Sequence, residues 1–277
     1  MIAPVTGREA PAVRLELTPS PHVHTPDSTA RIMWTVVATL MPVLAAAVWF
    51  FGIGALLIVG AATAGALLTE RLTGPRSATR DGSATITGLL LGLILPPGFP
   101  LWMAFLGGVV AIGFGKVIFG GLGQNVFNPA LVGRAFLQAA FPAAITTWPA
   151  AQGGLLQLRG DLFALPLMSP RVDAVTEATP LGLMKFEHTA TDMGALLLGN
   201  TGGSLGETSA LLILLCGAYL AWKRYLEWRI PVAIFVSVAA LSALLWSVDQ
   251  ARYADPLFML FSGGLAFGAV FMATDMV

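Results

Sequence analysis

The feature that most constrains this chain is a series of apolar stretches long enough to cross a lipid bilayer. A membrane-spanning helix needs roughly 17 to 25 mainly apolar residues, and stretches near that length recur along the sequence. We predict about eight spans from them. Their approximate limits are 33–51, 54–69, 84–96, 101–119, 129–148, 207–223, 230–248 and 256–273. The sequence therefore predicts an all-α, polytopic membrane protein.

The composition supports this fold class. Hydrophobic residues make up 56% of the chain and charged residues 11%, against roughly 25% charged residues in a typical soluble domain. Basic and acidic residues number 15 each, so no overall charge points to a nucleic-acid partner. The one cysteine, Cys216, lies in an apolar run, which excludes a disulfide within the chain and favours a packed apolar role.

A long, more polar stretch divides the spans into five before it and three after it. This arrangement suggests two inverted repeats of five transmembrane helices, the second truncated. We therefore expect a polar N-terminal segment (1–30), a first transmembrane repeat (31–148), a loop (149–205) and an incomplete second repeat (206–277). The third span is short and ends in LPPGFP, so we expect it to be tilted, broken or partly inserted.

The basic residues near the spans predict the orientation. Lys and Arg are retained on the cytoplasmic side of a membrane, and with eight spans all of these residues fall on one face: Arg71, Arg76, Arg80, Lys116, Lys223, Arg224 and Arg229. The N-terminus shares that face. The 149–205 loop then lies outside the cytoplasm.

Familiar enzyme signatures are absent from the sequence, and no catalytic residue is expected. His22 and His24 alternate in SPHVHTP, but no further metal ligand is evident nearby, so no metal site is expected. The run DGSATITGLLLG places Ser83, Thr85 and Thr87 at helical spacing among glycines. Close helix packing is the favoured interpretation, with a lined pocket as the alternative.

The run GQNVFNPALVGRAF brings Asn125, Asn128 and Arg134 to the entrance of the fifth span. Asn128 suits the N-cap of a helix whose first residue is Pro129. A helix N-terminus beside an arginine can hold an anionic or carbonyl-bearing ligand. The equal alternative is a capped helix with Arg134 reaching the membrane interface.

Inside the polar loop, DAVTEATPLGLM contains a threonine suited to modification. Pro180 favours an extended backbone at Thr179, and Ala178 leaves the hydroxyl unobstructed. No basic partner is evident nearby in the sequence, so we do not expect this hydroxyl to act as a nucleophile.

Several motifs together resemble one family. Asp173, Thr176, Ala178 and Thr179 resemble the Asp-x-x-Ser/Thr-x-Ala-Thr sequence at which a flavin transferase joins FMN to threonine. With SPHVHTPDSTARIMW, DGSATITGLLLGLILPP, GQNVFNPALVGRAF and FMATDMV, the chain is similar, over nearly its whole length, to the D subunit of the Rnf electron-transport complex. It is also similar to the B subunit of the sodium-pumping NADH:quinone oxidoreductase.

The resemblance implies a redox subunit that is not catalytic alone. It implies FMN bound covalently to Thr179 within the attachment motif, a noncovalent riboflavin, and the other Rnf subunits, especially G, A and E, as partners together with the flavin transferase. It also implies a bacterial inner membrane location and coupling of electron transfer to Na⁺ or H⁺ transport. Asn125, Asn128 and Arg134 are candidate flavin contacts.

Two other functions stay open from the sequence. Inverted five-helix repeats with glycine-rich helices also serve solute channels and secondary transporters. A subunit that scaffolds redox partners without a cofactor is the third interpretation.

Overall fold

The computed structural model describes residues 27–74, 78–149, 154–156, 158, 160–166, 178–199, 201–207, 209–250 and 252–275. All regular structure of any length in these ranges is helical, as predicted, and no sheet is formed there. Three of these helices are long and apolar enough to cross a membrane: α1 (Thr29–Phe51), α2 (Gly54–Thr73) and α10 (Arg229–Val248).

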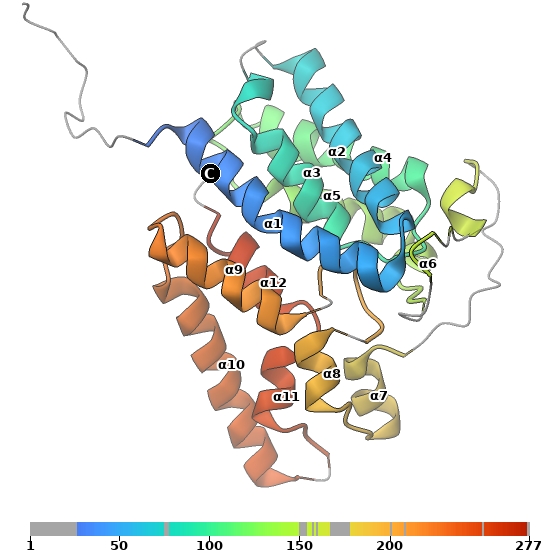
Figure 1. Cartoon of the computed structure of the whole chain (residues 1–277), viewed down its shortest axis with the longest axis vertical. Helices are drawn as coiled ribbons and strands as arrows, with labels where there is room; N and C mark the ends of the chain where they lie inside the picture. The colour runs from blue at the N-terminus through green and yellow to red at the C-terminus, as the bar shows by residue number, and fades with distance from the viewer. Residues whose placement is uncertain are drawn as a thin grey trace, which may run out of the picture.

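The first part of the chain forms one helical bundle, coloured blue to green in Figure 1. It contains α1, α2, α3 (Ser83–Leu93), α4 (Leu101–Ile112) and α5 (Pro129–Ala140). Ser28 caps α1, since its side chain accepts a hydrogen bond from the Arg31 amide. Helix α3 lies inside the bundle: ten of its eleven residues are buried. A helix this short and this enclosed is held by its neighbours.

Glycines let the neighbours of α2 approach it closely. An added Cβ would lie 2.3 Å from the Thr63 Cα at Gly88, 2.6 Å from the Val59 Cα at Gly92, and 2.1 Å from the Ala62 carbonyl oxygen at Gly108. Small residues allow this kind of backbone contact where lipid supplies no hydrophobic drive for association. The DGSATITGLLLG run therefore packs closely through Gly88 and Gly92, as favoured, while Ser83 and Thr87 of the same run line a narrow cavity.

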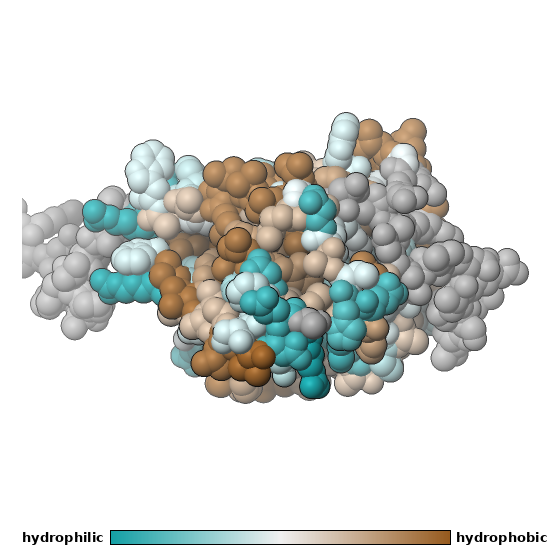
Figure 2. Space-filling model, turned by 90° about the horizontal axis from the view of Figure 1, so that it is seen from below, coloured by the Kyte–Doolittle hydropathy of each residue, from teal (hydrophilic) through white to brown (hydrophobic). Residues whose placement is uncertain are grey.

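The second part of the chain begins with α7 (Pro180–Glu187) and α8 (Met193–Leu198), followed by α9 (Ala210–Trp222) and α10. Helices α11 (Pro256–Phe261) and α12 (Leu265–Phe267) then lead into the π-helix η4 (Gly268–Met272). Helix α9 packs beside α1 (Figure 1). Seen from below, polar side chains gather in the middle of the face and apolar ones flank them (Figure 2).

Two predicted spans are broken in the structure. The span predicted at 129–148 ends as α5 at Ala140, and a four-residue helix, α6 (Pro142–Ile145), follows, because Pro142 has no amide to continue the α5 ladder. The span predicted at 256–273 stops at Ser262 and restarts after Gly263, whose φ is +64°. The prediction of continuous spans was wrong at both places.

The predicted third span is a short helix, as expected from its sequence. Helix α3 ends at Leu93, and a turn through Pro96 and Pro97 leads back to α4. At this turn Pro149 also approaches, since a Cβ on Gly98 would lie 3.3 Å from the Pro149 Cγ. The repeat symmetry and the total of eight spans stay predictions.

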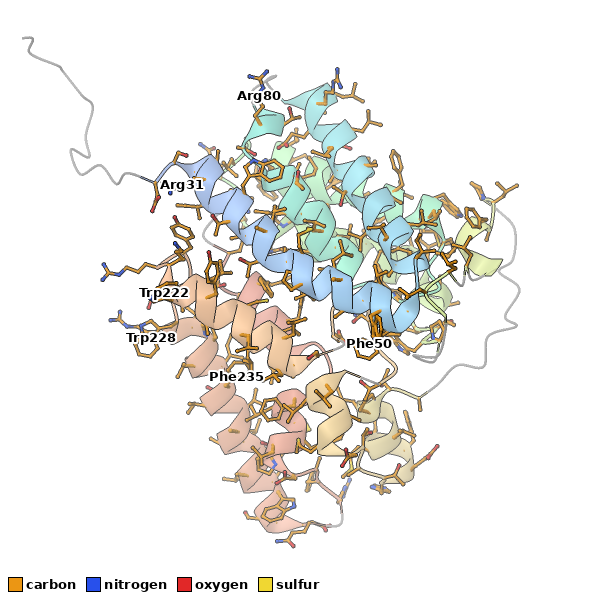
Figure 3. All side chains as sticks on the ribbon, in the orientation of Figure 1. Arg31, Phe50, Arg80, Trp222, Trp228 and Phe235 are labelled. Carbon is orange, nitrogen blue, oxygen red and sulfur yellow. The ribbon has the colours of Figure 1, made fainter. Side chains whose placement is uncertain are left out.

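Basic residues gather at one end of the bundle. The Trp34 indole donates to the Arg80 carbonyl at 3.3 Å, which brings the start of α1 beside the α2–α3 connection. Arg31 and Arg80 lie at this end, as do the tryptophans 222 and 228 that flank the α9–α10 turn (Figure 3). That this end faces the cytoplasm stays a prediction.

We expect Gly108→Ala to destabilise the bundle, because the new methyl group would meet the Ala62 carbonyl oxygen. Overpacking of this kind typically costs about 1–3 kcal/mol. Thermal unfolding of the purified protein in detergent measures the effect. Gly60→Ala is the matched control, since Gly60 is exposed on α2 with nothing within 4 Å of an added Cβ. Equal melting temperatures for the two variants would contradict the close α2–α4 contact.

Candidate functional site

The end of α3 is held by groups from two distant parts of the chain. The Arg134 guanidinium, on α5, donates to the Ile94 carbonyl at 2.6 Å. The Gly206 amide donates to the Leu93 carbonyl at 2.6 Å, and the Leu205 amide donates to the Leu95 carbonyl at 3.1 Å. These bonds satisfy carbonyls that a helix C-terminus leaves without an intrahelical partner. Arg134 is therefore directed towards the end of α3, and its position relative to the membrane interface stays a prediction.

Beside Arg134 lies a cavity of about 440 Å³. It is bounded by the end of α3, one face of α5, Glu207 and the segment from Gly264 to Ala273. An added Cβ on Gly264 would lie 2.6 Å from a Glu207 carboxylate oxygen, so this carboxylate lies directly against the start of α12. A cationic and an anionic side chain thus line one cavity between the two parts of the chain. The volume of this cavity is typical of small-molecule sites.

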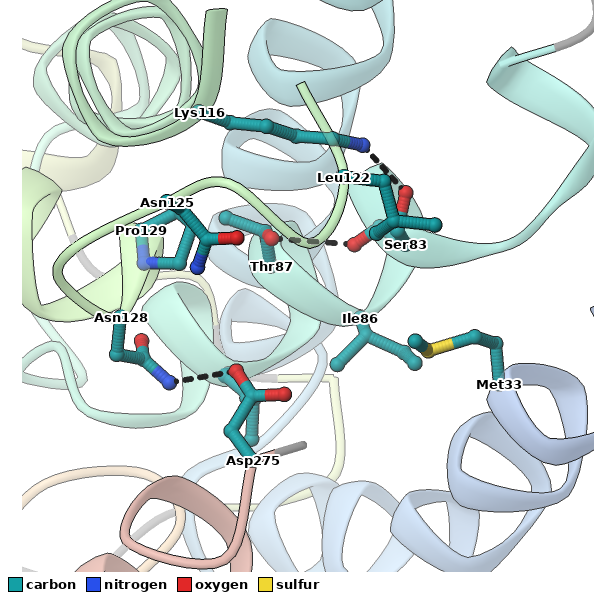
Figure 4. A pocket seen from close by; sticks show the side chains of 11 residues that line it. Met33, Ser83, Ile86, Thr87, Lys116, Leu122, Asn125, Asn128, Pro129 and Asp275 are labelled. Carbon is teal, nitrogen blue, oxygen red and sulfur yellow. Dashed lines mark hydrogen bonds between the residues drawn. The ribbon is translucent and has the colours of Figure 1, made fainter. Parts of the chain in front are cut away.

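A second cluster of polar groups is buried in the first bundle. Lys116, in the π-helix η2 (Gly113–Val117), pairs with the Glu70 carboxylate of α2, and both side chains are almost fully buried. The Lys116 ammonium also donates to the Ser83 hydroxyl at 2.6 Å (Figure 4). The Ser83 hydroxyl in turn donates to Asp81 at 2.6 Å. A continuous polar chain therefore runs from Asp81 to Glu70.

Asn125 and Asn128 line a separate, narrow cavity with Lys116 and Ser83 (Figure 4). Its volume is about 20 Å³, room for roughly one water molecule. Asn128 caps α5 as predicted, because its side-chain oxygen accepts from the amides of Ala130 at 3.0 Å and Leu131 at 3.2 Å. Its side-chain nitrogen donates to Asp275 at 2.9 Å. The three candidate flavin contacts therefore border two different cavities, with Arg134 at the larger one.

Thr179 is the N-cap of α7. Its backbone is extended (φ −62°, ψ 155°), as Pro180 predicts, and its hydroxyl accepts from the Gly182 amide at 3.2 Å. Leu181 lies against the break between α11 and α12, since a Cβ on Gly263 would meet its Cδ1 at 2.9 Å. Asp173 and Thr176 lie outside the described residues, as do His22 and His24.

The structure corrects one interpretation of the charges and adds a feature that the sequence analysis missed. Lys116 was counted among the interfacial basic residues, but it is buried against Glu70. The predicted second span stopped one residue before Glu70, although α2 continues to Thr73. A lysine within an apolar run and a glutamate at the end of another were the available signal that the two form a buried pair.

Comparison with known proteins now bears on this arrangement. The model of the NQR2, RnfD, RnfE family matches residues 16–277. The chain belongs to this family. The resemblance read from the motifs is therefore confirmed, and the match includes every element that forms the two cavities.

Individual relatives in this family are similar over most of the chain. The D subunit of the proton-translocating ferredoxin:NAD⁺ oxidoreductase complex of Clostridium ljungdahlii is 40% identical, over 93% of this chain and 77% of its own length. The D subunit of the Na⁺-translocating ferredoxin:NAD⁺ oxidoreductase complex of Acetobacterium woodii is 38% identical, over 95% of this chain and 77% of its own length. The D subunit of the ion-translocating oxidoreductase complex of Stutzerimonas stutzeri is 40% identical, over 91% of this chain and 77% of its own length.

We expect Lys116→Met to destabilise this family member strongly, because Glu70 would keep a buried charge without its partner. Removing one partner of a buried ion pair typically costs about 3–5 kcal/mol. Denaturant unfolding in mixed micelles measures the change. The double variant Glu70→Leu/Lys116→Met is the control, and it should recover most of the loss since no unpaired charge is left. A double variant as unstable as the single one would show that the charge pairing is not the cause.

Proposed function

We propose that this chain is the D subunit of an ion-translocating ferredoxin:NAD oxidoreductase complex of the Rnf type, carries FMN covalently on Thr179, and passes electrons coupled to Na⁺ or H⁺ transport. The observation that carries the proposal is the family match over 16–277, together with the position of Thr179 at the N-terminus of α7. The similar subunits are named for such complexes.

The surroundings of Thr179 fit a phosphoester. The threonine is partly exposed, as modification by a transferase requires. A phosphate on this oxygen would lie at the N-terminus of α7, where backbone amides and the helix dipole favour an anion. The Gly182 amide, which already donates to the hydroxyl oxygen, is the nearest such donor.

The packing of α7 gives Thr179 a defined place relative to the rest of the protein. Leu181 contacts the break between α11 and α12 at Gly263, and the next residue, Gly264, lines the 440 Å³ cavity that contains Arg134. We propose that the isoalloxazine ring is held near this break, at the membrane surface between the two parts of the chain. Arg134 would then supply a fixed positive charge on the cavity wall.

A bound flavin supplies one-electron chemistry whose potential the protein adjusts through charge and hydrogen bonds. A second, noncovalent flavin such as riboflavin does not fit inside the 20 Å³ cavity beside Asn125 and Asn128. Asp275 and the two asparagines are, however, partly or fully exposed. We propose that these asparagines contact such a ring from the exposed side, where their amides can donate to ring carbonyls.

For ion transport, the buried Glu70–Lys116 pair is the candidate element. Ionisable residues inside a membrane are costly and by default functional. The hydrogen-bonded chain through Ser83 links the pair to Asp81 at the end of the bundle. The two relatives named for a proton and for Na⁺ are about equally similar to this chain, so the similarity favours neither ion.

The proposed setting is the inner membrane of a bacterium, with the other Rnf subunits, especially G, A and E, as partners and a flavin transferase as the modifying enzyme. The alternative functions, a solute channel or transporter and a cofactor-free scaffold, predict no covalent flavin. Detection of flavin on the protein therefore separates the proposal from both alternatives.

We expect Thr179→Ala to abolish covalent flavin while leaving membrane insertion intact, because the acceptor hydroxyl is lost and the side chain buries little apolar surface. Thr179→Ser should retain some modification, since a hydroxyl remains, and Thr176→Ala should reduce it. In-gel flavin fluorescence and the mass of the Thr179 peptide measure the result after expression with the transferase.

Thr189→Ala is the control for this series, because Thr189 is exposed in the segment after α7 and outside the motif. Its fluorescence should equal that of the unaltered protein. Fluorescence that survived in Thr179→Ala but vanished in Thr176→Ala would show that the residue assignment is wrong. If flavin fluorescence were absent from the unaltered protein and from every variant, while the transferase modified another substrate, the channel or scaffold function would be favoured.

We expect the attachment loop to lie outside the cytoplasm. In a Cys216→Ala background, a cysteine at Ala174 should react with an impermeant thiol reagent in intact cells. A cysteine at Arg80 lies among the basic residues at the end of the bundle where α3 begins. It should react only after the cells are broken. The reverse pattern would overturn the predicted orientation.

A further inference from the structure

The α9–α10 turn carries a group of basic side chains on a well-fixed backbone. The turn runs from Lys223 to Trp228, and its amides at 223, 224 and 225 donate to carbonyls of α9 at about 3.0 Å each. Leu226 is buried and anchors the turn in the core. Lys223, Arg224 and Arg229 are exposed. Their positive charges therefore extend from a rigid base, which lowers the entropy lost when a ligand is bound.

The charges around this turn do not balance. Arg229 pairs with Glu227 at 3.7 Å, and Arg31 of α1 pairs with Asp27 at 3.3 Å. Asp27 also accepts a hydrogen bond from Tyr225: desolvation, and then this bond, raise the pKa of the Tyr225 phenol. Within the described part of the chain, Lys223 and Arg224 have no carboxylate at ion-pair distance. The turn thus offers two positive charges to an external anion.

Two tryptophans flank these cations. Trp222 is 77% exposed and Trp228 is 57% exposed, and both lie at the same end of the molecule as Arg31 (Figure 3). The Lys223 ammonium lies 5.7 Å from the centre of the Trp222 ring. Tryptophan concentrates where a membrane meets water, because its ring is apolar and its N–H is polar. The turn therefore has the composition that is typical of a membrane–water interface.

Apolar surface continues from the turn along both helices. On α9 the exposed side chains of Leu215, Tyr219 and Trp222 share one helix face, and on α10 those of Val232 and Val236 do so. In the most apolar 18-residue stretch of α10, only 11% of the residues are buried within the chain. Such a surface, joined to paired cations, matches a ligand that has an anionic head and apolar chains.

We propose that the α9–α10 turn binds the headgroup phosphate of an anionic phospholipid, whose acyl chains lie on the exposed faces of α9 and α10. Lys223 and Arg224 contact the phosphate, and Trp222 and Trp228 lie beside the glycerol region. The charge complementarity favours a lipid over an apolar protein helix, which would leave the two cations without partners. The site does not depend on the flavin assignment.

The test compares lipids on the purified full-length chain by native mass spectrometry. Phosphatidylglycerol should bind in preference to phosphatidylcholine. The double variant Lys223→Gln/Arg224→Gln should lose roughly 25-fold in phosphatidylglycerol affinity, about fivefold per charge, with no change for phosphatidylcholine. Trp222→Ala should weaken the binding of both lipids, because it removes apolar contact.

Arg252→Gln is the matched control. Arg252 is exposed at the opposite end of α10 and lies over the Tyr253 ring at 5.8 Å, so it has a similar cation–ring contact without a second cation beside it. The affinity of the Arg252→Gln variant for phosphatidylglycerol should equal that of the unaltered protein. The charge-preserving variant Lys223→Arg/Arg224→Lys should retain the preference, which separates loss of charge from loss of folding. Equal affinity for the two lipids, or equal losses in Arg252→Gln and the double Gln variant, would overturn the proposal. Protein–protein cross-links from residue 224 in the assembled complex, with no retained lipid, would also overturn it.

Discussion

The arrangement of this protein depends on satisfying the carbonyls where α3 ends inside the helical bundle. Irregular backbone that is shielded from water is tolerated only where protein groups supply the hydrogen bonds. Here the Arg134 guanidinium and the amides of Leu205 and Gly206 supply the hydrogen bonds. Because Arg134 belongs to the first bundle and residues 205–206 lead into α9, the same bonds that complete α3 also join the two parts of the chain. The larger cavity lies beside this junction.

The two polar features inside the helices differ in what they require of the protein. Arg134 donates to a neutral carbonyl and also borders the cavity that contains the Glu207 carboxylate. Lys116 and Glu70 satisfy each other, although one Glu70 oxygen has no hydrogen-bond partner among the described residues. A buried pair is a weak source of stability, because desolvation offsets its attraction. For this reason, and because the chain has so few charged residues, we propose the pair as the element for ion transport.

Much of the fold could be predicted from the sequence, and the failures share a physical cause. Apolar length located α1, α2 and α10, the LPPGFP run indicated a short third span, and Asn128–Pro129 predicted the start of α5. Hydropathy does not show whether an apolar stretch forms one unbroken helix, so the breaks at Phe141 and Gly263 were missed. It also does not report pairing: Glu70 and Lys116 are 46 residues apart and meet only because α2 packs against η2. Thr179 was found through a motif, whereas its contact with the α11–α12 break through Leu181 depends on tertiary packing.

The segment that carries Thr179 leaves and rejoins the bundle at one place. Pro149 lies against Gly98, and Leu205 donates to Leu95, so both ends of the excursion meet the same α3–α4 turn. A loop whose ends are pinned together can change in length at little thermodynamic cost, since each doubling adds only about 0.6 kcal/mol of closure entropy. The connections on either side of α7 and α8 can therefore change in length without redesigning the helices of the bundle, while α7 stays packed at the α11–α12 break through Leu181.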